Sequence, residues 1–183
     1  MIQTIKKRMP SDNLGVTYFH EHLLFLPPEP FASQDQDLRL YDVEAAIEEV
    51  ESFKRAGGNT IVEMSTVEMG RDPTNLERIS DATGVNIIAA TGYNKGKFCE
   101  RYIGDREPYD LAREMIKDLT EGMGETKLLA GLIKISTSKN EVLPVEDKVI
   151  KAAIIAQRET GAPVSTHTEA GTMALDQIEY LVK

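Results

Sequence analysis

Five strand-like segments alternate with helix-like segments along this chain, and their order constrains the fold more than any other feature. The apolar segments fall at residues 15–24, 60–66, 85–92, 128–138 and 162–171. An amphipathic segment follows each one, for example residues 43–53, where Val43, Ile47, Val50 and Phe53 mark one helical face. Five strand-then-helix units predict an α/β domain with a parallel sheet and right-handed crossovers. Two architectures fit, a doubly wound open sheet and the first five units of an eight-unit barrel.

Turn and cap residues divide these units. Asp72 and Pro73 are predicted as the N-cap and first residue of a short helix that Gly84 ends. Residues 93–107 are predicted as a long polar loop. No linker or low-complexity tract interrupts the chain, so we expect residues 1–183 to form a single domain.

The charge balance narrows the class of partner. The chain has a formal net charge of −9 and a pI near 4.9, whereas a nucleic-acid surface needs clustered Lys and Arg. No segment approaches the ~20 apolar residues of a membrane span. One cysteine, Cys99, excludes an internal disulfide and fits a reducing compartment. We therefore expect a cytoplasmic protein that handles a small-molecule substrate, with no nucleic-acid or membrane partner, and with a homodimer as an option.

All three histidines lie near the carboxyl ends of predicted strands. His20 and His22 are two residues apart in the first strand, so their imidazoles face one side and could share a metal ion. The alternative for an isolated pair of this kind is two hydrogen-bonded histidines. His167 lies toward the end of the fifth strand, and functional side chains of parallel α/β folds come from these ends.

Lys134 has the same position in the fourth strand, between Ile133 and Ile135. A buried ammonium must be paired or must lose its charge through a lowered pKa. A neutral amine can take up carbon dioxide to form a carbamate, an anion able to bridge two cations. The alternative is an ion pair with an acid such as Glu63.

Together these segments resemble the phosphotriesterase-like group of the amidohydrolase superfamily. The similarity covers nearly the whole chain and is carried by LGVTYFHEHLL, NTIVEMSTVEMGRDP, IIAATGYN, AGLIKISTS and APVSTHTEAG. The H-x-H pair alone is shared with the wider superfamily, whereas HEHL together with the GRDP turn, the strand-four lysine and THTEAG is more specific.

The resemblance implies a (β/α)8 TIM barrel with a binuclear metal centre, usually of zinc, with manganese or cobalt in some members. It implies that His20 and His22 bind the more buried ion, that carbamylated Lys134 bridges both ions, and that His167 binds the second. A hydroxide held between the ions would attack a lactone, a related ester or a phosphotriester. The family pattern also has a histidine on strand six and an aspartate on strand eight. Neither has a counterpart here, and we expect a part barrel that lacks strands six to eight.

The predicted loop after the third strand carries Tyr93, Lys95, Lys97 and Arg101 on the presumed active-site side. Basic residues there could bind a substrate phosphate or carboxylate, and Tyr93 a lactone ring. The alternative is a solvated basic loop balanced by nearby acids. Glu169 could orient His167 through a hydrogen bond, or form a salt bridge at the rim.

Two other functions remain open from the sequence. One is a noncatalytic part barrel that binds a partner through its exposed sheet edges. The other is an amidohydrolase that acts on an amide or a cyclic imide. We expect a phosphorylated sugar lactone as one candidate substrate of the lactonase.

Overall fold

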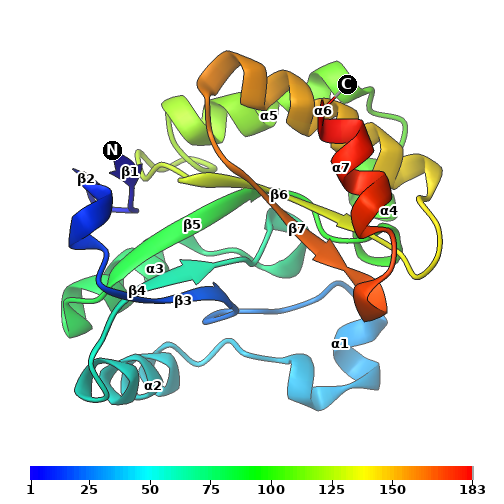
Figure 1. The fold of residues 1–183 in the computed structure, drawn as a ribbon. Coiled ribbons are helices and arrows are strands. Elements are labelled where there is room, and N and C mark those ends of the chain that lie inside the picture. The colour runs from blue at the N-terminus through cyan, green and yellow to red at the C-terminus, as the bar shows by residue number, and fades with distance from the viewer. Residues whose placement is uncertain (183) are drawn as a thin grey trace.

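The computed structural model describes residues 1–182 and contains seven strands and seven α-helices (Figure 1). The strands are β1 (Ile2–Gln3), β2 (Arg8–Met9), β3 (Val16–Glu21), β4 (Gly58–Glu63), β5 (Asn86–Gly92), β6 (Leu132–Thr137) and β7 (Val164–Thr168). The helices are α1 (Phe31–Gln34), α2 (Val43–Arg55), α3 (Pro73–Thr83), α4 (Gly96–Ile103), α5 (Pro108–Thr120), α6 (Pro144–Thr160) and α7 (Ala174–Val182).

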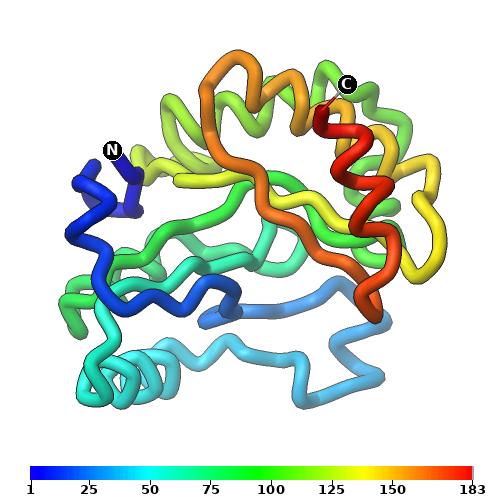
Figure 2. Tube along the Cα trace, in the orientation of Figure 1, coloured from blue at the N-terminus to red at the C-terminus, as the bar shows by residue number. Residues whose placement is uncertain are grey.

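The main sheet has five parallel strands in the order β3-β4-β5-β6-β7, the same as their order in the chain. A doubly wound sheet would reverse direction at a switch point, and this order contains none. The chain trace shows the sheet curling, with helices on its outer side (Figure 2). The sheet therefore has the topology of part of a (β/α)8 barrel, as predicted.

Alternation along the strands separates two apolar layers. Ile61, Ile87, Ile133 and Ile135 face outward and belong to the large cluster that packs against the helices. Val62, Met64, Ile88, Ala90 and Leu132 form a smaller cluster on the inner face. Because side chains alternate along each strand, every second one packs against the helices and the others face the barrel interior.

All five strands of the main sheet point the same way, and their carboxyl ends meet at one rim. In Figure 1 this rim is at the right, next to α1, α4 and the turn that follows β7. The antiparallel β1–β2 pair lies at the opposite end. Side chains at the ends of different strands are therefore brought to a common edge.

Local signals explain how the helices begin and end. The Asp72 side chain accepts a hydrogen bond from Asn75 N at 3.0 Å and caps α3, as predicted. Gly84, with φ of 70°, ends the same helix in the left-handed conformation. The Asp42 side chain caps α2 in the same way.

Several predicted boundaries were wrong. The strands predicted over 60–66, 128–138 and 162–171 are Gly58–Glu63, Leu132–Thr137 and Val164–Thr168. The first strand was predicted over residues 15–24, but β3 ends at Glu21, because Leu23 N then donates to the Glu63 side chain and Phe25 pairs with Leu40 and not with β4. Residues 93–107 were predicted as loop, but they contain α4, whose buried Gly96, Cys99 and Ile103 recur at helical spacing among charged residues. Among the described residues, no helix is long and apolar enough to cross a membrane.

Candidate functional site

All four predicted ligand residues lie at the same rim. His20 lies near the end of β3 and His22 just beyond it, while Lys134 and His167 lie on β6 and β7. Lys134 pairs with Gly92 of β5, and His167 pairs with Ser136 of β6. Lys134 and Ser136 share the inner face with Leu132, so Lys134 and His167 both project into the barrel interior.

The two histidines of the H-x-H pair lie side by side. Their ring centroids are 5.6 Å apart, and His22 Nδ1 is 3.0 Å from Ser65 Oγ. Burial, assisted by the positive charge of Lys134, lowers the pKa of His22 to about 3 and lowers the pKa of His20 as well. Both imidazoles are therefore neutral near pH 7, which is the form that binds metal ions.

Lys134 is a buried lysine without an ion pair in the part of the chain that the structure describes. Its side chain is 1% exposed, and Nζ donates a hydrogen bond to Met64 O at 3.1 Å. Burial lowers the pKa of Lys134 to about 8, although the charges of Glu68 and Glu63 act in the opposite direction. A substantial neutral fraction near neutral pH is what carbamate formation requires.

Glu63, the alternative partner of Lys134, is engaged elsewhere. Its carboxylate accepts hydrogen bonds from the backbone N–H groups of Leu23 and Ser65. Burial raises the pKa of Glu63 to about 7. Glu63 thus ties the segment that follows β3 to the end of β4, and Ser65, which it also binds, contacts His22. This arrangement fixes the position of the H-x-H pair.

His167 carries an unused ligand atom. Among residues 1–182, its buried Nε2 has no hydrogen-bond partner. Its backbone oxygen accepts a hydrogen bond from Gln177 Nε2 of α7 at 3.0 Å. A residue of the helix layer therefore fixes the backbone position of His167. Burial and the charge of Lys134 lower the pKa of His167, which leaves a neutral imidazole with a free nitrogen.

These observations fit a metal site. Three neutral imidazoles, one with an orphaned buried nitrogen, and a buried lysine with a lowered pKa form a donor set suited to zinc and related divalent ions once the lysine is carbamylated. Within residues 1–182, however, no group of three or more His, Cys, Asp or Glu side chains has an arrangement that could itself hold an ion. The histidines alone do not form a preassembled cluster, and Lys134 is the central member of the set.

Glu68 is a further charged residue at this rim that sequence reasoning missed. It lies in the 3-10 turn Val67–Met69 and is 8% exposed. Its Oε1 accepts hydrogen bonds from Asn94 N at 2.6 Å and Thr66 Oγ1 at 2.8 Å, while Oε2 has no partner within the described chain. Burial raises the pKa of Glu68. An acid between Val67 and Met69 was the only sequence signal for this burial.

The structure brings together only some of the residues predicted after β5. Lys95 Nζ lies 5.9 Å from the centroid of the Phe98 ring, which Lys97 Nζ also approaches. Tyr93 is buried in the helix-facing core, and its hydroxyl accepts a hydrogen bond from Arg106 at 3.4 Å, so it points away from the barrel interior. Arg101 is exposed on α4. Lys97 is exposed, and its ammonium lies 4.7 Å from the Phe98 ring centroid. Of the three basic residues, only Lys95 is buried.

Lys95 forms the salt bridge that was one of the two alternatives for Glu169. Lys95 Nζ lies 2.5 Å from Glu169 Oε1. Glu169 also accepts a hydrogen bond from Lys139 N at 3.2 Å, and both bonds lower its pKa. The positive charge of Lys95 contributes to the lowered pKa of His167. The pair therefore lies near His167.

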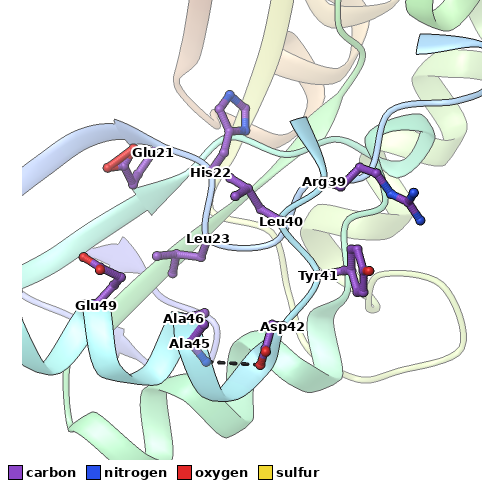
Figure 3. A pocket seen from close by; sticks show the side chains of 10 residues that line it. All are labelled: Glu21, His22, Leu23, Arg39, Leu40, Tyr41, Asp42, Ala45, Ala46 and Glu49. Carbon is purple, nitrogen blue, oxygen red and sulfur yellow. Dashed lines mark hydrogen bonds between the residues drawn. The ribbon is translucent and has the colours of Figure 1, made fainter. Parts of the chain in front are cut away.

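A pocket of about 410 Å³ lies beside the rim, between the end of β3 and α2. Its lining includes Leu23, Tyr41 and Ala46, and His22 is the one predicted ligand residue among the lining residues. Figure 3 shows the His22 ring extending away from Ala46. This pocket is on the outer side of β3, so it is distinct from the inner face where Lys134 and His167 project.

Comparisons with known proteins agree with this architecture. The model of the Phosphotriesterase family matches residues 1–183. A phosphotriesterase homology protein of Escherichia coli is 34% identical over 94% of this chain and 59% of its own length. A phospho-furanose lactonase of Mycoplasmopsis agalactiae is 31% identical over 99% of this chain and 55% of its own length.

Solved structures give the same result. The crystal structure of a lactonase from Listeria monocytogenes superimposes with a TM-score of 0.90 at 33% identity, covering 99% of this chain and 60% of that chain. The chain thus spans 55–60% of the length of these relatives. With a family model that matches every residue and a half-barrel that superimposes closely, the chain belongs to the phosphotriesterase family.

Proposed function

We propose that this protein is a metal-dependent hydrolase that opens a lactone ring or a related ester. One observation carries the proposal: His20, His22, Lys134 and His167 come from three different strands to one rim of the half-barrel. Relatives named lactonase and aryldialkylphosphatase support hydrolysis of an ester bond. The activity is proposed for the eight-stranded barrel to which these five units would contribute.

Two divalent ions, most simply zinc, with manganese or cobalt as alternatives, would be held by these side chains. His20 and His22 would bind one ion, carbamylated Lys134 both ions, and His167 the second. When bound, such ions activate water as a nucleophile and polarise the carbonyl or phosphoryl oxygen under attack.

The chain's own residues prepare this site. The hydrogen bond between His22 Nδ1 and Ser65 Oγ fixes the ring and leaves Nε2 as the ligand atom. Leu132, on the same face of β6 as Lys134, belongs to a buried apolar cluster with Val62 and Ile88, and Lys134 is only 1% exposed. Loss of one proton from the Lys134 ammonium, addition of the amine to carbon dioxide and loss of a second proton to solvent would give a carbamate anion, which removes a buried positive charge and supplies two ligand oxygens.

A substrate screen on protein of measured intact mass tests the proposal. The panel contains neutral lactones, phosphorylated sugar lactones, a phosphotriester, a linear amide and a cyclic imide. We expect lactone hydrolysis that chelation abolishes and that zinc, manganese or cobalt restores in the presence of bicarbonate. Activity on the amide or the imide alone would favour the amidohydrolase alternative. No bound metal and no hydrolysis would favour a noncatalytic part barrel.

A further inference from the structure

Gln177 is the buried residue of α7. Within Ala174–Val182 it is the only fully buried side chain, at 1% exposure, while Tyr180 and Leu181 are partly buried against the core. A helix that covers a sheet normally places apolar side chains at its most buried positions. Burying an amide costs free energy unless its polar atoms find partners. Packing alone therefore does not explain a glutamine at this position.

The amide nitrogen of Gln177 joins the carboxyl ends of two neighbouring strands. Nε2 donates hydrogen bonds to Thr137 Oγ1 at 2.5 Å and to the backbone oxygen of His167 at 3.0 Å. Thr137 is the last residue of β6 and shares the helix-facing side of the strand with Ile135. A backbone oxygen can only accept a hydrogen bond, so the nitrogen of the amide, and not its oxygen, must face His167.

The oxygen of the same amide has no partner. Within residues 1–182, Gln177 Oε1 is buried and accepts no hydrogen bond. An unpaired buried acceptor lowers stability, so glutamine is not the residue that stability alone would favour here. What the side chain supplies is a donor at a fixed place, directed at the ends of β6 and β7.

Gln177 also closes the turn that leads from β7 back into α7 (Figure 1). Its backbone N donates to Met173 O at 3.0 Å, while its side chain holds His167 O, so one residue binds both ends of the turn. The turn is strained, because Ala170 and Met173 have positive φ angles of 52° and 64°. Strain of this kind persists only where surrounding contacts hold it, and it occurs often at functional sites.

His167 depends on this tie to its backbone. Its ring projects to the inner face, on the side of the sheet away from α7, and its buried Nε2 has no partner in the part of the chain that the structure describes. The ring of His22, in contrast, is held directly by Ser65 Oγ. Metal–ligand distances vary by only about 0.2 Å. The backbone position at the end of β7 therefore decides where the His167 ring can meet an ion.

We propose that Gln177 is a positioning residue for His167: its amide fixes the end of β7 from the helix layer and thereby places the imidazole for the second metal ion. The inference rests on the proposed function, because the ion at His167 belongs to that proposal. Gln177 lies on the opposite side of the sheet from the ring, so it acts through the backbone and contacts neither the ion nor the substrate.

Histidine ring resonances of the metal-free protein test the inference without bound metal or turnover. The chain has three histidines, so NMR can follow each ring. Gln177→Met keeps the length of the side chain and removes both donor hydrogens. We expect it to shift the ring resonances of His167 and to leave those of His20 and His22 in place. Gln157→Met, at an exposed glutamine of α6, is the matched control and should shift none of the three.

Zinc affinity, measured by competition with a chelator in the presence of bicarbonate, gives a second readout. The dissociation constant of the zinc ion that shifts the His167 resonances should rise about tenfold in Gln177→Met, the effect typical of losing a residue that orients a metal ligand. The constant of the other ion should change less than about twofold. Asp72→Ala, which loses a remote helix cap, controls for lowered stability and should keep both constants. Unchanged His167 resonances, or equal weakening of both ions, in folded Gln177→Met would overturn the inference.

The wild type provides a test that needs no variant. The side-chain NH2 protons of Gln177 should exchange slowly with water, because both are hydrogen-bonded inside the protein. Rapid exchange in the folded wild type would overturn the inference, whether or not Gln177→Met folds. A wild type that binds no zinc, together with the expected His167 shifts in Gln177→Met, would contradict the proposed function and leave the positioning of His167 intact. Two bound zinc ions with no effect of Gln177→Met would have the opposite meaning.

Discussion

Lys134 should lower the stability of the metal-free protein, and removing its charge should therefore stabilise the fold. The ammonium is buried, has no ion pair within the described chain, and has a pKa lowered to about 8 from 10.5. A difference of this size corresponds to about 3 kcal/mol at pH 7. Methionine has a similar unbranched shape, so Lys134→Met should remove most of this penalty.

One contact acts against the gain. The hydrogen bond from Lys134 Nζ to Met64 O is lost in the variant, which costs about 1 kcal/mol. We therefore expect Lys134→Met to raise the free energy of unfolding by about 2 kcal/mol at pH 7. Lysine at this position would then be retained for its chemistry and not for stability.

The sign of the pH dependence follows from the lowered pKa. Between about pH 8 and pH 10.5 the unfolded wild type binds more protons at Lys134 than the folded wild type, so wild-type stability rises with pH in this window. The advantage of Lys134→Met should shrink over the same range. All other side chains are the same in both proteins, so comparing the two proteins isolates the contribution of Lys134.

Urea unfolding followed by circular dichroism measures these free energies. The chain has no tryptophan, and the buffers must be free of metal and carbon dioxide so that Lys134 remains an amine. Lys127→Met serves as the control, because an exposed lysine should give a change near zero. If Lys134→Met were less stable than the wild type at pH 7, or if its advantage did not depend on pH, the reasoning would be refuted.

Three further substitutions test how the rim is supported. Asp72→Ala should lower the free energy of unfolding, measured by chemical denaturation, by about 1 kcal/mol through loss of the α3 cap. Asp72→Asn should keep most of the wild-type stability, because asparagine also caps helices. Arg71→Ala should lower the free energy of unfolding by about 3–5 kcal/mol, because the Asp118 carboxylate, 2.8 Å away and only 4% exposed, loses its counter-ion and keeps only the hydrogen bond from Thr91; a loss below about 1 kcal/mol would contradict this. Gly92→Ala should lower the free energy of unfolding by a comparable amount, since φ is 94° here and a Cβ would lie 2.1 Å from Lys134 O. It should also shift the amide NMR resonance of Lys134, and an unchanged spectrum would contradict this.

Much of the fold could be predicted from the order of the strand and helix signals. The period-two segments and the caps at Asp72 and Gly84 are local features, so they can be seen in the sequence. The early end of β3 and the helix α4 could not, because both depend on tertiary contacts. After Glu21 the backbone bonds to the Glu63 side chain and to Leu40, and α4 buries Cys99 and Ile103 against other elements.

The candidate site was predictable only in part. His20, His22, Lys134 and His167 could be brought to one rim because the carboxyl ends of parallel strands share an edge. Tyr93 was interpreted as a substrate contact, although alternation from Ile88 through Ala90 and Gly92 already places it on the outer face. The salt bridge between Lys95 and Glu169 joins residues far apart in the chain, and only the folded structure brings them together.

Metal content tests the central claim most directly. The protein is purified without chelators, supplied with zinc and bicarbonate, and analysed for bound elements beside the Lys134→Met and His22→Asn variants. The account predicts about two zinc ions per protein molecule in the wild type, including any manganese or cobalt retained from purification, and a large loss of bound metal in both variants. A folded wild type without metal, or variants that retain the wild-type metal content, would contradict it.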